Sequence, residues 1–482
     1  MYQTTIFDIM YPKYKITKPI RLIELFAGYG SQALALKYLG VKFEHWKICE
    51  WAVKSIQAYK DIHFTDDTRN YSEVASKEEI QEMLLKWGIS SNYNEPMTRE
   101  QINRLSEEQL RTIFNNISAT NNLVNIQDVK GDDLAIVNKD EYDYILTYSF
   151  PCQDLSLAGK GKGMADTSTR SGMLWEVERI LNELKTTNSL PQILLMENVP
   201  QVHGSDNVEH FNKWQLALEN MGYKNYFQDL IATDYGIPQT RNRCFMVSIL
   251  GDYSYSFPKP IPLKLKLKDM LEEEVDEKYY LSDKQLTYIL DGNDVALKSG
   301  RNINDRIINP QITKTISCRG AADQRADVTN FVIDNEENEI TVKEAKLRIK
   351  NATKQVYLEA TDNGGKDRGV CVGTYQYAKS DKFMNGKDRL QLGKETSDTL
   401  QTSPKEGVCY NDLRIRKLTP RECGRLMGVK DKDITNMLKN QSNSSAYHCF
   451  GDSIICTVLC AIFGELLNID YKNLIESWNY NE

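Results

Sequence analysis

The segment from Arg21 to Gly40 constrains the fold more than any other part of the chain. Arg21 to Phe26 is a short apolar run that predicts a buried strand, and a glycine-rich turn, Ala27 to Ala33, follows it directly. Leucines and alanines at helical spacing come next, and Gly40 ends them. A strand, a glycine turn and a helix in this order are typical of a parallel α/β sheet with a ligand at its strand ends.

A second strand, predicted over Val41 to Cys49, ends on Glu50 and Trp51. The acid lies about twenty residues after Gly30, which is the spacing of a carboxylate that binds ribose hydroxyls in nucleotide-binding sheets. The first part of the chain therefore predicts a site for a nucleotide cofactor.

Two further predicted strands, Tyr142 to Ser149 and Gln192 to Met196, also end on chemically reactive residues. Cys152 follows the first behind Pro151, and Glu197 follows the second. Most cysteines are buried core residues. Here the neighbouring residues favour a nucleophile, because the carboxyl ends of the strands face a binding crevice and a thiolate is intrinsically reactive.

The loop from Leu157 to Gly163 alternates glycines with Lys160 and Lys162. A helix or strand is unfavourable for such a loop, because glycine loses much conformational entropy in either. It is either a flexible surface loop or a cationic lid that closes on a polyanion, and its place beside Cys152 favours the lid.

Two antiparallel strands, Tyr226 to Thr233 and Arg243 to Leu250, are predicted around a connection that ends on Arg241 and Arg243. On an extended chain, residues two apart point to the same face. We expect both guanidinium groups to act together, and simple solvation at the surface is the alternative.

The chain of 482 residues exceeds one hydrophobic core, and the prolines from Pro258 to Pro262 indicate a boundary. We expect three parts. They are a catalytic and cofactor-binding domain over 1–257, a smaller β-rich domain over 258–410, and a C-terminal segment over 411–482. The apolar helix predicted from Ser453 to Leu467 should return to the first domain, and Thr341 to Asn351 predicts a helix in the second.

Residues 71–122 are polar and predict a helical insertion. Capping boxes are expected at three pairs, Ser76 with Glu79, Thr98 with Gln101, and Ser106 with Gln109. The charges of this insertion are more typical of solvated helix faces than of a DNA-binding surface.

The composition narrows the class of protein. A net charge of −7 argues weakly against nucleic-acid binding, because 60 basic residues can still form one cationic face. Ten cysteines without C-x-x-C spacing, and five histidines without ligand spacing, predict neither disulfides nor a metal site. The sequence predicts no membrane span, and the N-terminus lacks the pattern of a secretory signal, so we expect a cytoplasmic protein.

Taken together, these motifs resemble the DNA cytosine-5 methyltransferases of the bacterial and phage type. The resemblance spans nearly the whole chain, and its blocks occur in the family's order at Phe26–Gly30, Glu50–Trp51, Phe150–Gln153, Glu197–Val199, Gln239–Arg243, Arg421–Glu422 and Gly451–Ser453. The resemblance implies the Rossmann-like, doubly wound α/β sheet of class I S-adenosylmethionine-dependent methyltransferases. It also implies that residues 258–410 form a target-recognition domain.

The resemblance implies a covalent mechanism on double-stranded DNA. Cys152 would attack C6 of a cytosine flipped out of a short specific sequence, and Glu197 would hydrogen-bond N3 and the exocyclic amine. Arg241 and Arg243 would hold the base at O2 and brace the thiol. The methyl group of S-adenosylmethionine would go to C5, leaving S-adenosylhomocysteine, and loss of the C5 proton would release Cys152.

The resemblance also implies two sets of binding residues. The cofactor would contact residues from both ends of the chain: Phe26, Gly28, Gly30, Glu50, Trp51, Asn125, Ile126, Pro151, Leu174, Asp452 and Ser453. DNA would contact polar residues near the nucleophile and the arginines: Gln153, Ser156, Lys160, Lys162 and Gln239. Three positions depart from the family, since Ser31 replaces a glycine, Asn125 an aspartate and Asp452 an asparagine.

Three other readings compete. A nicotinamide-dependent oxidoreductase fits the glycine turn and Glu50, yet leaves Cys152, Glu197 and the arginine pair unexplained. A non-enzymatic base-flipping protein would lack the nucleophile or the acid, and both are present. Methylation of a tRNA cytosine fits the same catalytic residues, but the long variable region favours duplex DNA. We expect a monomer in the bacterial cytoplasm or nucleoid, acting with a cognate restriction endonuclease or as an orphan or phage enzyme.

Overall fold

The structure is a computed structural model that describes residues 12–151, 171–280, 307–308, 313, 315–316, 330–333 and 415–480. The chain forms two compact units. Unit 1 comprises Met1–Leu265 and Cys423–Glu482, and unit 2 comprises Lys266–Glu422. The proline run, Pro258 to Pro262, belongs to unit 1. The Tyr235 hydroxyl donates to the Pro258 carbonyl at 2.8 Å, and the backbone at Tyr235 pairs with that at Ile261.

Unit 1 is built on a six-stranded sheet with the order β2-β1-β3-β4-β6-β5. Its strands are β1 (Ile20–Leu25), β2 (Phe43–Cys49), β3 (Asp143–Tyr148), β4 (Ile193–Asn198), β5 (Tyr223–Ile231) and β6 (Asn242–Leu250). The first four run parallel, and β6 runs antiparallel to both β4 and β5. The predicted Rossmann-like α/β sheet is confirmed.

The order of the strands reverses between β1 and β3. The chain passes from β1 to β2 on one side and later returns to place β3 on the other side of β1. In open α/β sheets the crevice at such a reversal is where ligands bind. The fold therefore directs attention to the ends of β1, β2, β3 and β4.

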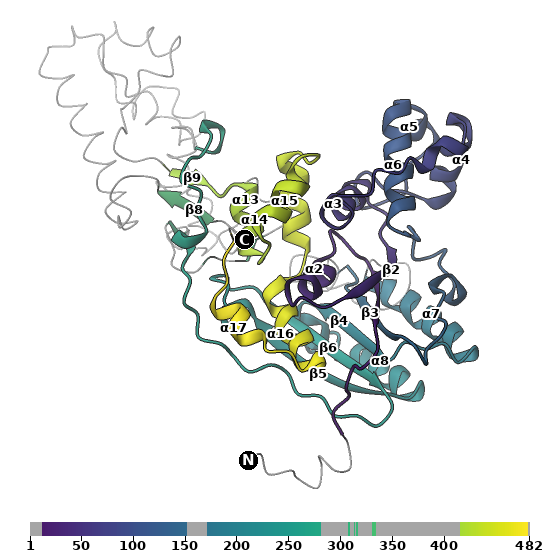
Figure 1. Cartoon of the computed structure of the whole chain (residues 1–482), viewed down its shortest axis with the longest axis vertical. Helices are drawn as coiled ribbons and strands as arrows, with labels where there is room; N and C mark the ends of the chain where they lie inside the picture. The colour runs from purple at the N-terminus through teal and green to yellow at the C-terminus, as the bar shows by residue number, and fades with distance from the viewer. Residues whose placement is uncertain are drawn as a thin grey trace, which may run out of the picture. The chain divides into compact units, whose positions relative to one another are not determined.

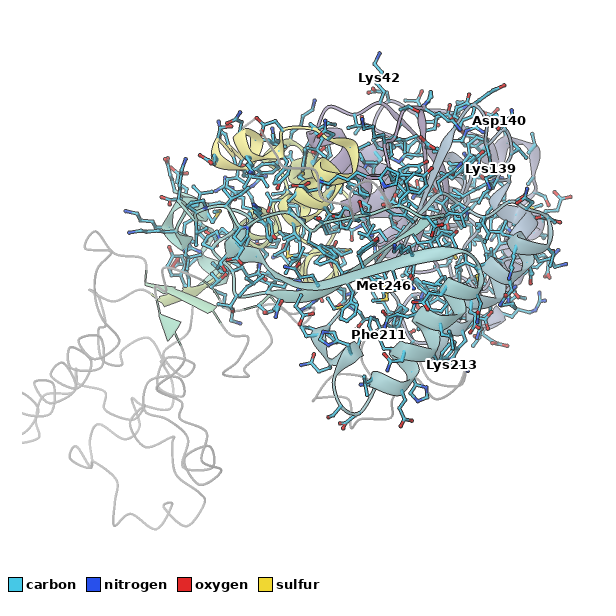
Figure 2. All side chains as sticks on the ribbon, turned by 90° about the horizontal axis from the view of Figure 1, so that it is seen from below. Lys42, Lys139, Asp140, Phe211, Lys213 and Met246 are labelled. Carbon is cyan, nitrogen blue, oxygen red and sulfur yellow. The ribbon has the colours of Figure 1, made fainter. Side chains whose placement is uncertain are left out.

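Helices cover both faces of the sheet (Figure 1). The core on one face packs α7 (Leu174–Thr186) and α8 (Val208–Asn220) against residues that include Leu25 and Met246, and Figure 2 labels Met246 beside Phe211 of α8. Glu24 points to the opposite face, where it accepts a hydrogen bond from Ala33 of α2 (Ser31–Tyr38). Helix α16 (Cys456–Leu467) packs on α2 there.

The remaining helices of unit 1 surround this framework. They are α3 (Val53–His63), η2 (Gly131–Leu134), η3 (Ser171–Met173), η4 (Pro200–His203), η5 (Ala232–Asp234), α14 (Asp431–Leu438), α15 (Asn443–Asp452) and α17 (Tyr471–Glu476). Helix α13 (Pro420–Leu426) begins at a proline, which is favoured in the first turn of a helix.

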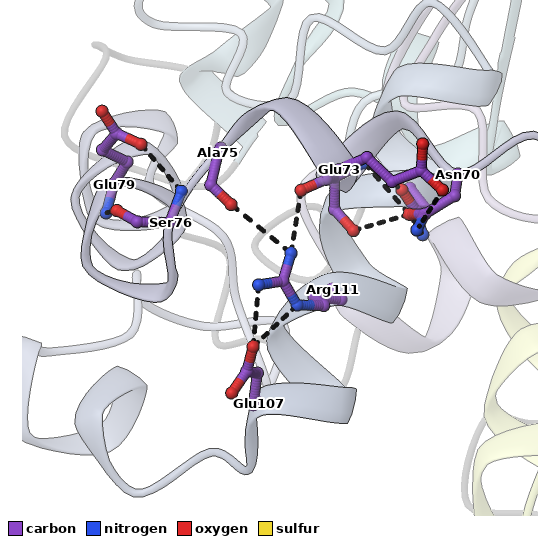
Figure 3. Close-up of polar contacts among 9 residues, drawn as sticks. Asn70, Glu73, Ala75, Ser76, Glu79, Glu107 and Arg111 are labelled. Atoms are coloured by element: carbon purple, nitrogen blue, oxygen red, sulfur yellow. Dashed lines mark hydrogen bonds and ion pairs between the residues drawn. The ribbon is translucent and has the colours of Figure 1, made fainter.

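The insertion is helical and has a small core of its own. It contains η1 (Tyr71–Val74), α4 (Lys77–Trp87), α5 (Arg99–Asn103) and α6 (Glu107–Ala119). The three predicted capping boxes are confirmed at the starts of α4, α5 and α6. Arg111 of α6 pairs with Glu107 and donates to the Ala75 carbonyl (Figure 3). The Arg111–Glu107 distance is 2.7 Å, and Arg111 also donates to the Ser72 carbonyl, which joins η1 to α6.

The sequence predicts no membrane span, but one segment, Asn443–Leu467, is long and apolar enough to be a candidate. It qualifies by length and composition, with a mean hydropathy of 1.8. However, 83 % of that window is buried inside the protein, and residues 453–455 break it into α15 and α16. Such burial is what the core helix of a globular unit produces.

The described part of unit 2 holds η6 (Leu267–Met270), η7 (Glu277–Tyr279) and a small sheet with the order β7-β8-β9. Strands β7 (Ile307–Ile308) and β8 (Asn330–Ile333) are parallel, and β9 (Ile415–Lys417) is antiparallel to β8. Glu422, from one family block, accepts from the buried Arg416 at 2.8 Å. The helix predicted at Thr341 to Asn351 lies outside the described residues.

The buried carboxyl of Glu24 should make the free energy of unfolding depend on pH in an unusual way. Burial raises the pKa of this carboxyl to about 7, although it accepts hydrogen bonds from Tyr59 and Ala33. A raised pKa in the folded state adds stability below the ordinary value, and this stability is lost as the pH rises through about 7. We expect urea unfolding to show that wild type loses about 3 kcal/mol relative to Glu24→Gln between about pH 5 and pH 9.

The exposed carboxyl Glu108 on α6 supplies the matched control, and Glu108→Gln should keep the wild-type profile. Parallel stability profiles for wild type and Glu24→Gln would contradict the assignment of a neutral Glu24 in the folded protein.

Candidate active site

A cavity of about 570 Å³ opens at the carboxyl ends of β1, β2, β3 and β4. It lies at the reversal of strand order, where the sheet predicts a binding crevice. Most of the residues predicted to bind cofactor or base line it: Phe26, Gly28, Glu50, Trp51, Asn125, Ile126, Pro151, Glu197, Arg241, Arg243, Asp452 and Ser453.

The glycine turn after β1 forms one wall of the cavity. Phe26 and Gly28 both have left-handed backbone conformations, with φ of 59° and 56°. A phenylalanine rarely adopts this conformation, so surrounding contacts must hold the turn. The turn brings the Gly28 amide to 2.9 Å from Glu50 at the end of β2.

Glu50 is held by backbone amides. Gly28 donates to one carboxyl oxygen, and Ala52 donates to the other at 2.8 Å. Burial raises the pKa of Glu50 to about 7, although these amides favour the charged form. The Trp51 amide is a third backbone donor to this carboxyl. Because a carboxylate offers about four acceptor positions, capacity remains for a hydroxyl group of a ligand.

Asn125, which the resemblance predicts to stand in place of the family's aspartate, lines the same cavity. Its amide donates to Asp128 at 2.8 Å, and its oxygen accepts from the Gln127 amide. The preceding Val124 has φ of 65°, which is a strained conformation for a β-branched residue. The segment is thus held in one shape beside the cavity.

Glu197 and Arg243 form a buried ion pair at the end of β4. Arg243 Nε lies 3.1 Å from Glu197 Oε1, and the two side chains are 18 % and 10 % exposed. Burial raises the pKa of Glu197, while the charges of Arg243 and Arg241 oppose the shift. A carboxyl with a raised pKa can carry a proton toward an acceptor on a bound base.

Arg241 reaches a different part of the chain. Its guanidinium donates to the carbonyl of Gly451 at 3.0 Å and to that of Ser453 at 2.6 Å. Ser453 has an extended backbone, so α16 begins at Cys456 rather than at the predicted Ser453. This contact places Asp452 and Ser453 on the wall of the cavity.

The ends of β3 and β4 are also joined. The Asn198 side chain donates to the Phe150 carbonyl at 3.0 Å. Pro151, the next residue, lines the cavity. The predicted nucleophile Cys152 follows Pro151 but lies outside the described residues, as do Gln153, Ser156, Lys160 and Lys162.

Three of the predicted site residues that the structure describes do not line the cavity. Gly30 caps α2 and faces Tyr59 and His63, so that a side chain there would clash. Leu174 is fully buried in the core, and its neighbour Met173 lines the cavity instead. Gln239, predicted to contact DNA, is fully buried and donates to the Leu426 carbonyl at 2.8 Å.

Sequence reasoning missed part of the cavity wall. The residues concerned are Ser55, Tyr93, Asn94, Pro96, His448 and Cys449. No motif marks them, because they come from the insertion, from α3 and from α15, and only the fold brings them together.

One group among the described residues has the side chains that metals prefer. His203, Asp229 and Cys244 place their ligand atoms within 4.8 Å of one another. His203 Nε2 lies 2.9 Å from Asp229 Oδ1, and burial raises the pKa of the Cys244 thiol. A hydrogen-bonded group with a protonated thiol explains this arrangement without an ion.

Comparisons with known proteins show the family of the chain. The model of the family "C-5 cytosine-specific DNA methylase" matches residues 98–468. The chain is 35 % identical to the type II methyltransferase M2.ScrFI of Lactococcus lactis subsp. cremoris over 451 residues, covering 93 % of this chain and 99 % of that protein. It is 39 % identical to the orphan methyltransferase M.SssI of Spiroplasma monobiae over 239 residues, covering 49 % of this chain and 61 % of that one.

Solved structures support the fold. The Entamoeba histolytica methyltransferase EhMeth superimposes with a TM-score of 0.53 at 14 % identity, covering 94 % of this chain and 99 % of that chain. The Dnmt2 methyltransferase of S. pombe gives a TM-score of 0.50 at 16 % identity, covering 93 % and 98 %. With the family match over most of its length, the chain belongs to the C-5 cytosine-specific DNA methylases and is a DNA cytosine methyltransferase.

Proposed function

We propose that this methyltransferase methylates C5 of a flipped-out cytosine in a short sequence of double-stranded DNA, through a covalent bond between Cys152 and C6. The observation that carries the proposal is the convergence of two different carboxyl sites in one cavity. Glu50 is held by backbone amides and Glu197 by Arg243, and both line that cavity. Pro151, directly before Cys152, lines it as well.

Glu197 and the arginines suit the base. Attack of the Cys152 thiolate on C6 pushes electrons toward N3, and a carboxyl at Glu197 can donate a proton or hydrogen bond there. Arg243 holds the Glu197 side chain in place and adds positive charge beside the developing anion. The C5 carbon then becomes nucleophilic, takes the methyl group, loses its proton, and the thiolate leaves C6.

The residues near Glu50 suit S-adenosylmethionine. The remaining acceptor capacity of Glu50 can serve the ribose hydroxyls, and Trp51 offers an aromatic face for adenine. When bound, S-adenosylmethionine supplies an electrophilic methyl group. Phe26, Gly28, Asp452 and Ser453 complete the wall of this part of the cavity.

The other proposals follow from the family. A stacked cytosine cannot present C6 to a thiol, so the base must leave the duplex at a cost of a few kcal/mol. We propose that residues 258–410 recognise the DNA sequence, that Lys160 and Lys162 contact DNA, and that the enzyme acts as a cytoplasmic monomer, in a restriction-modification system or alone. On this proposal, unit 2 selects the DNA sequence and unit 1 carries out the methyl transfer.

Replacement of the nucleophile should abolish methylation and leave binding intact. We expect Cys152→Ala to bind S-adenosylhomocysteine and duplex DNA as wild type does, because only the covalent step needs the thiol. Sequencing of DNA from expressing cells at 5-methylcytosine resolution should show one recurring short sequence methylated by wild type and unmethylated with Cys152→Ala.

Cys460→Ala, which removes a buried thiol on α16, is the matched control and should keep the methylation pattern. Methylation by Cys152→Ala would sink the covalent mechanism. Methylation of tRNA but not of DNA by wild type would instead favour the RNA substrate.

Cofactor affinity should depend on pH through Glu50. Burial raises the pKa of this carboxyl to about 7 in the free protein, and the ionised form accepts the ribose hydroxyls. As the pH falls below about 7, a growing fraction of Glu50 is protonated, and the dissociation constant of S-adenosylmethionine should rise about tenfold per pH unit.

Calorimetric titration between about pH 6 and pH 8 measures this dependence. Glu50→Gln, which has no titrating carboxyl, should bind more weakly and without the same pH dependence. An affinity that is independent of pH in wild type would show that Glu50 does not control binding.

A further inference from the structure

The loop between α4 and α5 carries the insertion into the predicted cofactor site. Tyr93, Asn94 and Pro96 of this loop line the same cavity as Glu50 and Trp51. The loop is fixed to the end of β2, because the Ser90 amide donates to the Trp51 carbonyl at 2.8 Å and Ser90 accepts from the Val53 amide at 2.9 Å. The insertion thus contacts the residues that are expected to bind adenosine.

Tyr93 is held by a stack with α15. Its ring lies 3.8 Å from that of His448, and the two planes differ by 9°. His448 Nδ1 in turn lies 3.2 Å from the carboxylate of Asp452. Tyr93 has φ of 64°, a strained conformation that persists only where surrounding contacts determine it. The stack therefore joins the insertion to the C-terminal wall of the cavity.

The far end of the insertion holds Glu50 as well. The Asn122 side chain accepts from the Glu50 amide at 3.0 Å and donates to the Glu50 carbonyl at 2.9 Å. An amide that pairs with both backbone groups of one residue restrains its position in the way that a neighbouring strand does. The insertion contacts the segment around Glu50 both from its α4–α5 loop and from its C-terminal end.

The surface of the insertion argues against a DNA-binding role. Its exposed side chains include many carboxylates, at Glu73, Glu78, Glu79, Glu82, Glu95, Glu100, Glu107 and Glu108. These carboxylates outnumber the five lysines and arginines of the insertion, whereas DNA-binding surfaces concentrate lysine and arginine. We therefore look for the role of the insertion at the cavity rather than at the DNA.

We propose that the insertion is a cofactor-binding element in which Tyr93, stacked on His448, forms a wall of the S-adenosylmethionine site and determines its affinity. The inference rests on the proposed function, because it assumes that the cavity binds this cofactor. In this chain the adenosine site is shaped by a segment that the sequence predicted to be a set of solvated helices.

Calorimetric titration with S-adenosylhomocysteine tests the proposal without relying on turnover. We expect Tyr93→Ala and His448→Ala each to weaken binding by roughly fivefold to tenfold, the effect of losing one aromatic contact. The double variant should lose less than the product of the two, because both remove the same stack. Glu50→Ala is the reference, and Val74→Ala, 91 % exposed on η1, is the control that should bind as wild type.

A second readout separates cofactor binding from general loss of structure. In both single variants the KM for S-adenosylmethionine should rise while kcat at saturation and the affinity for duplex DNA stay near wild type. Circular dichroism checks the fold, and if Tyr93→Ala does not fold, His448→Ala carries the test from the other side of the stack.

The outcomes are distinct. If Glu50→Ala weakens the binding of S-adenosylhomocysteine but a folded Tyr93→Ala or His448→Ala variant binds it as wild type does, the role of the insertion is overturned. The proposed function then stays in place. Loss of DNA affinity with unchanged cofactor binding overturns it in favour of a DNA contact. Unchanged binding in Glu50→Ala, or no binding by wild type, overturns both the cofactor site and the inference.

Discussion

The cavity depends on the contact between Arg241 and the C-terminal segment. A buried guanidinium at the start of β6 donates to the carbonyls of Gly451 and Ser453, more than two hundred residues later in the chain. Without it, two carbonyls at the end of α15 would lose charge-assisted hydrogen bonds, each typically worth about 1.5–3 kcal/mol. The contact also sets the extended backbone at Ser453, from which α16 starts toward α2. Arg241, next to β6, therefore holds the segment that places Asp452 and His448 in the cavity wall.

Within this frame, two carboxyls acquire different properties from different neighbours. Backbone amides donate to Glu50 and favour its charged form, although burial raises its pKa to about 7. Glu197 faces Arg243 in a pair that keeps it oriented while burial raises its pKa. Environments that treat two acids differently allow one to bind a neutral hydroxyl and the other to exchange a proton. One cavity can thus serve a nucleoside cofactor and a base at the same time.

How far the sequence predicted this site depends on the range of the interactions involved. Glu50 and Glu197 were predicted because each follows an apolar strand, and the capping boxes because each depends on four consecutive residues. Gln239 and Leu174 came from family motifs, which do not reveal that packing against Leu426 or the core buries them. Tyr93 and His448 had no local signal, since their stack arises only when α15 returns to the insertion.

The position of the insertion in the chain explains how it can reach the cavity. It lies in the connection that leaves β2 and returns to β3, and these strands flank β1 on opposite sides. The last part of that connection passes the carboxyl end of β2 and lines the cavity, at the reversal of strand order where ligands bind. Asn122 at its exit and Ser90 within it pair with the backbone around Glu50, so both contacts form beside the cavity. A segment added at this point enlarges the binding site without altering the sheet, because no strand pairing has to change.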